Sequence, residues 1–251
     1  DGFSTRFNLY ALSRVASIDI MVGLAMMVVI LTGGLNLSLG ALGVSSAMFG
    51  GWCMQSLGIP IIPSVFLILL FGTFLGWING YVTVKTGVHS FIVTLATMSI
   101  YFGFMTVLTQ AQSFKNLPDA FTDIGSMKLF YKYVSPLLLL SFFTGCILFY
   151  LFNFTDIGRK LIAAGANPRA AELSGISVNR MFVYCHMLSG FLAAVAGIMV
   201  TMRIGAAIPS IAGHLGFDWL LPAFLAPVLG GTLLSGGKIT VFGTILGAIL
   251  V

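Results

Sequence analysis

Two short stretches of this chain place amide and hydroxyl side chains beside paired glycines, inside otherwise apolar sequence. The first reads TGGLNLSLG over residues 32–40, and residues 230–235 repeat its GGxxLS pattern. Their side chains offer neutral hydrogen-bond donors and acceptors rather than a titrating acid or base. Each stretch is either a loop outside the apolar medium or a break in a helix within it. The polar residues concerned are Asn36, Ser38, Thr232 and Ser235.

Patterns that would support catalysis are missing from the sequence. The nearest match to a phosphate-binding P-loop is Gly236-Gly237-Lys238. Thr232 stands where the motif needs its first glycine, and Ile239 stands where it needs serine or threonine. No HExxH or GxSxG motif occurs either. We therefore predict no catalytic residue, no metal ligand and no cofactor in this chain.

The histidines and cysteines form no cluster. We expect the histidines to be ordinary packed or interfacial residues, and the cysteines to be buried free thiols, because their odd number and apolar surroundings suit neither a disulfide framework nor a metal. These residues are His89, His186, His214, Cys53, Cys146 and Cys185.

The composition predicts a polytopic α-helical membrane protein. Of the 251 residues, 58% are hydrophobic and only 8% are charged, whereas a soluble domain carries roughly a quarter charged residues. The apolar runs are continuous rather than alternating with polar residues, which excludes a transmembrane β-barrel. The net charge of +5 is scattered over the loops, so nucleic acid is not an expected partner.

The apolar runs predict seven or eight membrane segments in a single domain, residues 1–251. A membrane-spanning helix needs about 20 residues. The final run has only 13, so we expect the chain to stop inside a helix and to be a fragment truncated at both ends. The runs cover about Ile18–Leu31, Leu39–Leu57, Ile61–Val84, Phe91–Leu108, Val134–Phe152, Met181–Met202, Phe217–Leu234 and 239–251.

Glycines at helical spacing predict close helix packing. Gly72, Gly76 and Gly80 form two overlapping GxxxG steps, and Gly243 and Gly247 form another. Small residues let helix backbones approach each other in lipid, and we favour this interpretation over a ligand-binding role. Glycine-interrupted segments in corresponding places of two halves are also typical of transporters with broken helices. The repeated GGxxLS pattern therefore favours two breaks within the membrane region.

Charged groups do not settle the orientation of the chain. Ionisable residues near spans suggest function, but snorkelling to the interface is the simpler interpretation for Asp19, His186, Arg203 and Asp218. The positive-inside rule gives six basic residues on each face. One face carries Lys85, Arg159, Lys160, Arg169, Arg180 and Lys238, and the other carries Arg6, Arg14, Lys115, Lys128, Lys132 and Arg203.

The loop over residues 153–180 holds a short helix candidate, Pro168–Leu173. Asn167 can cap its first turn, Pro168 suits the first helical position, and Gly175 can end it. So short a helix is not stable alone. The loop is either a solvated connection between spans or a helix that docks into a groove of another protein.

Four blocks of the sequence resemble one family, the permease subunits of ribose-type ABC importers in the branched-chain amino acid/simple sugar permease superfamily. They are FTDIGRKLIAAGANPRAAELSGI, TGGLNLSLG, HSFIVTLATMSIYFGF and LPAFLAPVLGGTLLSGGKITVFGTILGAIL. These blocks are spread over most of the chain. The resemblance implies a helical bundle with broken helices and about ten spans in the full-length family, of which roughly eight fall in this chain.

The resemblance also implies a mechanism and a set of partners. The chain would lie in the bacterial inner membrane, among lipid, beside a second, identical or related permease subunit. A cytoplasmic subunit would bind ATP and magnesium, and a periplasmic binding protein would deliver a monosaccharide. Asn36, Ser38, Thr232 and Ser235 would make weak contacts along the translocation pathway. The cytoplasmic coupling loop, residues 154–180, would dock on the ATPase through Gly165, Asn167, Pro168, Ala170, Ala171, Glu172, Ser174 and Gly175.

One departure from the family pattern keeps other substrates open. The hallmark has an acidic residue where this chain has Asn36. A role in charge would then be missing, whereas a role in hydrogen bonding would be kept. Branched-chain amino acid permeases often show Gly-Leu-Asn-Leu at a comparable place, so a branched-chain amino acid, an autoinducer or a nucleoside are alternatives. A secondary transporter or a channel, working without an ATPase, is the alternative from another class.

Overall fold

The computed structural model describes residues 5–127, 129, 134–211 and 214–251. It is 77% helical. The described residues form two isolated β-bridges, Phe114 with Ala207 and Leu129 with Val134, and no strand. The predicted all-α polytopic fold is confirmed. Lys128 and Lys132, assigned above to one membrane face, lie outside the described residues.

The helical elements follow the predicted apolar runs, with shorter helices in the loops. In chain order they are α1 (Arg6–Ile30), α2 (Leu39–Gly51), the π-helical turn η1 (Trp52–Ser56), α3 (Ile61–Thr86), α4 (Ser90–Leu108), α5 (Asp119–Ser126), α6 (Pro136–Phe154), α7 (Asp156–Ala166), α8 (Pro168–Leu173), α9 (Val178–Ile204), the 3₁₀ turn η2 (His214–Trp219), α10 (Leu220–Leu229) and α11 (Val241–Leu250).

Five of the described helices are long and apolar enough to cross a membrane: α1, α3, α4, α6 and α9. The other predicted segments are shorter helices, with 13 residues in α2 and 10 each in α10 and α11. The run Phe217–Leu234 is not one continuous helix, because α10 ends at Leu229 and Gly231 adopts a φ of +82°. The roughly eight expected segments are thus five long helices and three short ones.

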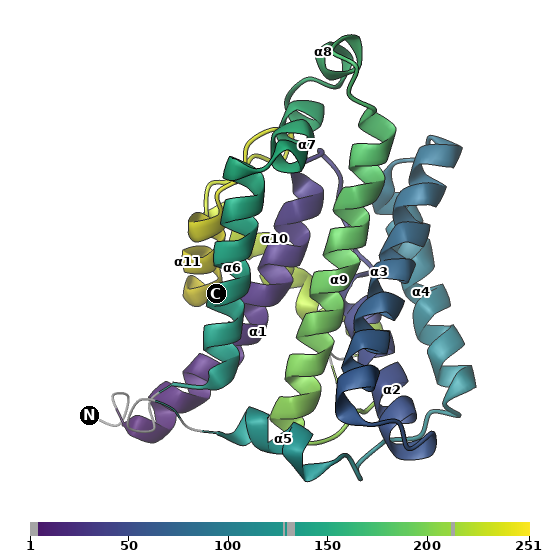
Figure 1. The fold of residues 1–251 in the computed structure, drawn as a ribbon, viewed down its shortest axis with the longest axis vertical. Coiled ribbons are helices and arrows are strands. Elements are labelled where there is room, and N and C mark those ends of the chain that lie inside the picture. The colour runs from purple at the N-terminus through teal and green to yellow at the C-terminus, as the bar shows by residue number, and fades with distance from the viewer. Residues whose placement is uncertain (1–4, 128, 130–133, 212–213) are drawn as a thin grey trace.

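Helices α1 and α9 form the centre of the bundle (Figure 1). Helix α9 packs against α3, α1 and α2, and α1 also contacts α6, α10 and α11. The apolar windows of α1 and α9 are 78% and 67% buried, against 28% in α3 and α6 and 33% in α4. The exposed side chains of these outer helices are largely apolar, as lipid contact requires.

Glycines set the distance between α3 and α9, as the GxxxG pattern predicts. A Cβ atom on Gly76 would overlap the carbonyl oxygen of His186, and one on Gly72 would lie 2.8 Å from the carbonyl oxygen of Gly190. Gly247 likewise touches α10, since its Cβ would overlap the carbonyl oxygen of Ala226. The predicted role of these glycines in close packing is confirmed.

The two ends of the bundle carry different loops (Figure 1). Helices α7 and α8 stand at one end, beyond the long helices, and α5 lies at the opposite end. At the α5 end, the guanidinium of Arg14 donates a hydrogen bond to the carbonyl oxygen of Arg203. Arg159 and Lys160 lie at the α8 end, both near the carboxylate of Asp156. These basic residues therefore lie at the two ends to which the charge pattern assigned them.

Replacing Gly76 with alanine tests the α3–α9 packing. Alanine is the better helix former by about 1 kcal/mol, but its methyl group would displace the backbone of α9. We expect a net destabilisation of about 1–3 kcal/mol, measured as a lower midpoint of thermal unfolding in detergent. Gly103→Ala on α4 is the matched control, because its Cβ would meet nothing within 4 Å. Equal midpoints for the two variants would contradict the packing model.

Candidate functional site

The chain is not helical between the end of α1 at Ile30 and the start of α2 at Leu39. The backbone amide of Leu35 donates to the hydroxyl of Ser90 at 3.0 Å, and the amide of Leu37 donates to the hydroxyl of Thr94 at 3.0 Å. Ser90 and Thr94 lie one turn apart on α4 and are buried. An apolar medium cannot pair a free backbone amide, so α4 supplies these partners. The predicted helix break in TGGLNLSLG is confirmed.

Asn36 is fully buried and is hydrogen-bonded at both ends of its amide. Its Oδ1 accepts from the backbone amide of Ser38 at 3.1 Å and from the Ser38 hydroxyl at 2.7 Å. Its Nδ2 donates to the hydroxyl of Ser189 on α9 at 3.1 Å. The side chain thus closes a local turn and ties the break to α9.

The same network continues into α3 and α4. The Nδ2 of Asn79 donates to the Ser38 hydroxyl at 2.8 Å. The hydroxyl of Tyr101 lies 2.8 Å from Oδ1 of Asn79 and 2.9 Å from the carbonyl oxygen of Leu75. Asn79 and Ser189 are fully buried, and Tyr101 is 5% exposed. Four elements, the break and helices α3, α4 and α9, are therefore joined by one buried set of polar contacts, which we call the Asn36 network (Ser189, Asn36, Ser38, Asn79 and Tyr101).

The predicted second interruption is present between α10 and α11. Its hydrogen bonds differ from those of the first break. The hydroxyl of Thr232 accepts a hydrogen bond from the amide of Thr240 at 3.3 Å, and Ser235 is exposed. Within the described part of the chain, neither residue is hydrogen-bonded to the Asn36 network. The two interruptions nevertheless meet, since a Cβ on Gly33 would lie 3.4 Å from the carbonyl oxygen of Ser235. The four predicted pathway residues thus fall into two separate pairs.

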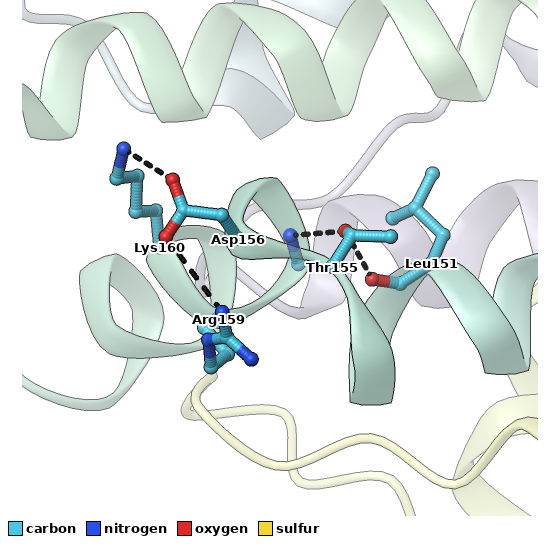
Figure 2. A network of polar contacts seen from close by, with 6 residues as sticks. Leu151, Thr155, Asp156, Arg159 and Lys160 are labelled. Atoms are coloured by element: carbon cyan, nitrogen blue, oxygen red, sulfur yellow. Dashed lines mark hydrogen bonds and ion pairs between the residues drawn. The ribbon is translucent and has the colours of Figure 1, made fainter.

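The loop over residues 154–180, the predicted coupling loop, begins at a tight corner between α6 and α7 (Figure 2). The hydroxyl of Thr155 accepts from the amide of Gly158 at 3.1 Å and donates to the carbonyl oxygen of Leu151 at 2.6 Å. Lys160 lies 2.6 Å from the carboxylate of Asp156 and lowers the pKa of that carboxyl. Because this pair is exposed, it adds little to stability. The Thr155 cap holds the corner.

Helix α8 has the predicted bounds, Pro168–Leu173, and both of its ends are capped. The Oδ1 of Asn167 accepts from the amide of Ala170 at 3.0 Å. At the other end, Gly175 adopts a φ of +80° and its amide donates to the carbonyl oxygen of Glu172 at 2.9 Å. The amide of Ile176 donates to the carbonyl oxygen of Ala171 at 2.9 Å, which completes a Schellman motif.

The coupling-loop residues divide into an inner and an outer set. Gly165 and Ala171 are buried, whereas Asn167, Pro168, Ala170, Glu172, Ser174 and Gly175 are exposed. Leu173 is 86% exposed at the tip of the loop. No other large apolar side chain among the described residues is as exposed.

Sequence analysis missed most of the hydrogen-bonding residues around the break. Asn79, Ser90, Thr94, Tyr101 and Ser189 were not proposed. A signal was present on α4, because Ser90, Thr94 and Tyr101 recur at i, i+4 and i+11 and so share one face of a helix. Asn79 carries a second signal, since a polar side chain within a membrane span needs a partner inside the protein.

His186 is a packed histidine, and its side chain does not reach the surface as the snorkelling interpretation predicted. It is fully buried on α9, its ring stacks on Phe182 with centroids 4.7 Å apart, and its Nδ1 lies 3.2 Å from the carbonyl oxygen of Phe182. Gly76 and Gly80 on α3 leave the space beside it. Its burial was not predictable from its place near the start of an apolar run.

Comparison with known proteins places the chain. The family described as branched-chain amino acid transport system / permease component matches residues 8–251. The chain belongs to this permease family. The permease is accordingly a multi-pass inner-membrane protein, in agreement with its five long apolar helices.

Individual relatives of the permease carry more specific names. It is 36% identical to the ribose import permease protein RbsC of Haemophilus influenzae, over 97% of this chain and 75% of the relative. RbsC of Bacillus subtilis is 35% identical over 99% and 76%. The autoinducer 2 import system permease protein LsrD of Salmonella typhimurium is 32% identical over 92% and 69%. No solved structure matches the chain. The resemblance to ribose-type permeases is confirmed.

Replacing Asn36 with leucine tests whether this residue serves packing or the translocation path. The variant removes the partners of Ser38 and Ser189, and each buried polar group left unpaired costs about 1–3 kcal/mol. We expect a lower thermal unfolding midpoint in detergent and reduced solute uptake, with membrane insertion kept. Asn36→Asp is the matched control, because it keeps oxygen acceptors for Ser38 and should be milder.

The two measurements separate the two roles. Loss of uptake at an unchanged unfolding midpoint would assign Asn36 to the path. Wild-type behaviour of Asn36→Leu in both measurements would contradict the importance of the network.

Proposed function

We propose that the permease is the membrane-spanning subunit of an ATP-driven ABC importer for a monosaccharide. A periplasmic binding protein delivers the sugar, and a cytoplasmic subunit binds ATP with magnesium and hydrolyses it. A second permease subunit, identical or related, completes the translocation unit. The relatives named ribose import permease, at 36% and 35% identity over almost the whole chain, support this substrate class.

The observation that carries the proposal is the build of α8. A six-residue helix has too few internal hydrogen bonds to persist alone, yet α8 has a side-chain cap at one end and a Schellman motif at the other. It projects beyond the long helices (Figure 1) and exposes Leu173 at its tip. An exposed apolar anchor on a rigid short helix suits docking in a groove of a partner protein. In this proposal the α8 end faces the cytoplasm.

The chemistry around the break favours a neutral solute. A cavity of about 310 Å³ lies beside the break, between the C-terminal end of α3 and the start of α9, with Thr32, His89 and Asn179 among its lining residues. No Asp, Glu, Lys or Arg lines it. A zwitterionic amino acid would need partners for both charges in such a setting, whereas a sugar presents only neutral hydroxyls. This favours a monosaccharide over a branched-chain amino acid.

An autoinducer is the second candidate substrate. The relative named autoinducer 2 import system permease is 32% identical over 92% of the chain. The neutral lining of the cavity does not distinguish it from a sugar. Nucleosides have no comparable support among the relatives described above.

Reconstitution tests the function directly. The permease, its ATPase and its binding protein would be placed in proteoliposomes, and uptake of labelled ribose would be measured with and without ATP. We expect labelled ribose to accumulate only when both ATP and the binding protein are present. Excess unlabelled ribose should reduce this uptake, and excess leucine should not. Uptake indifferent to ATP would indicate a secondary transporter or channel instead. If autoinducer 2 or leucine, but not ribose, competed for transport, that compound would be the substrate instead of a monosaccharide.

Replacing Gly175 with valine tests the docking role of α8. A side chain at its positive φ costs about 1–2 kcal/mol, which disturbs the Schellman motif. Gly205→Val is the matched control, because Gly205 has a φ of +77°, also has open space around it, and caps α9 at the opposite end. We expect similar unfolding midpoints for both variants. ATP-coupled uptake should fall only in Gly175→Val, by about tenfold if the docking free energy is weakened by about 1.4 kcal/mol. Equal uptake by the two variants would contradict docking through α8.

A further inference from the structure

Three segments that are distant in the sequence are in direct backbone contact, with no side chain between them, near the start of α8. They are the end of α7, the end of α1 with the first residues of the break, and the turn between α10 and α11. We call the meeting point the glycine junction, and define it by Leu31, Gly33, Gly165, Gly236 and Gly237.

The contacts in the glycine junction are between backbones. The amide of Gly237 donates to the carbonyl oxygen of Leu31 at 2.8 Å. A Cβ on Gly165 would overlap that same oxygen and lie 2.9 Å from the amide nitrogen of Gly237. A Cβ on Gly236 would lie 2.8 Å from the amide nitrogen of Gly33 and 3.1 Å from the carbonyl oxygen of Gly165. Backbone atoms cannot turn aside as a flexible side chain can.

The position of the junction in the chain connects the coupling loop to both helix breaks. Gly165 precedes Asn167, the cap of α8, by two residues. Leu31 and Gly33 lead into the Asn36 network, which holds α3, α4 and α9. Gly236 and Gly237 lie within the interruption between α10 and α11. One contact point therefore touches the two interruptions and the end of α7, which leads directly into α8.

We propose that the glycine junction transmits the movement of α8 to both broken segments as a rigid contact, with Gly165 as its central positioning residue. Closely packed protein has low compressibility and passes displacement on. A shift of the end of α7 must move the end of α1 and the α10–α11 turn with it, or separate the three backbones. The other connection of α8, through Gly175 to α9, has no comparable backbone contact, because a Cβ on Gly175 would meet nothing within 4 Å. This inference rests on the proposed importer function.

Gly165→Ala in the full importer complex is the first test. Gly165 lies inside α7 and has no positive φ, so alanine favours the helix itself and disturbs only the junction contacts with Leu31 and Gly237. We expect assembly and ATP hydrolysis to be kept while uptake per ATP hydrolysed falls about tenfold or more, corresponding to a loss of about 1.4 kcal/mol. Gly103→Ala, in open space on α4, should match the wild type. Wild-type uptake per ATP by Gly165→Ala would overturn the proposal.

If the Gly165→Ala complex does not assemble, a spin-label distance measurement on the otherwise native junction tests the same proposal. Labels on cysteines at the exposed positions Arg169 and Ser235, in a chain with the native cysteines replaced by alanine, report the distance across the junction. A second pair, at Thr86 and Ser235, reports movement of the turn relative to α3. On trapping the complex with ATP and vanadate, the first distance should stay constant and the second should shift. Any other combination overturns the proposal.

The two proposals fail in different ways. If the importer function is wrong, the wild-type complex shows no ATP-dependent uptake at all. If only the junction is wrong, the wild type remains coupled and Gly165→Ala is coupled equally well.

Discussion

A helix that ends inside an apolar bundle leaves backbone amides that lipid cannot pair, and this constraint organises the permease. The break after α1 is possible because α4 presents Ser90 and Thr94 to two of its free amides. Asn36 pairs a third amide, that of Ser38, and the side chains of Asn36 and Ser38 join the break to α9 and α3. The helices around the break are therefore positioned by hydrogen bonds as well as by the fit of apolar side chains.

Glycines allow segments to approach so closely that no side chain would fit between their backbones. On the α3–α9 interface it lets two long helices touch along their backbones. At the base of the coupling loop it lets three segments touch at one point. Polar contacts hold the centre of the bundle, and backbone contacts lie where we infer that movement enters it.

Much of the local structure was predictable because its causes are local. Asn167, Pro168 and Gly175 bounded α8 correctly, since a cap, a first-turn proline and a positive φ each act within a few residues. Hydropathy located every long helix, and where it extended an apolar run to Leu234, the GGxxLS pattern predicted the interruption that follows Leu229. Glycine in an apolar run permits either helix or turn; in the structure Gly230 packs against the backbone of Gly243, and Gly231 turns the chain with a positive φ.

The sequence by itself determined the membrane class, the helix positions, the helix break at TGGLNLSLG and the capped α8, because composition and short-range spacing carry that information. Only the tertiary structure decided the partners of Asn36, the burial of His186, and the meeting of Leu31, Gly165 and Gly237. The contacts of Asn36 with Ser189, and of Leu31 with Gly165 and Gly237, join residues more than a hundred positions apart in the chain. No period or motif encodes such pairs, since they depend on how complete helices pack against one another.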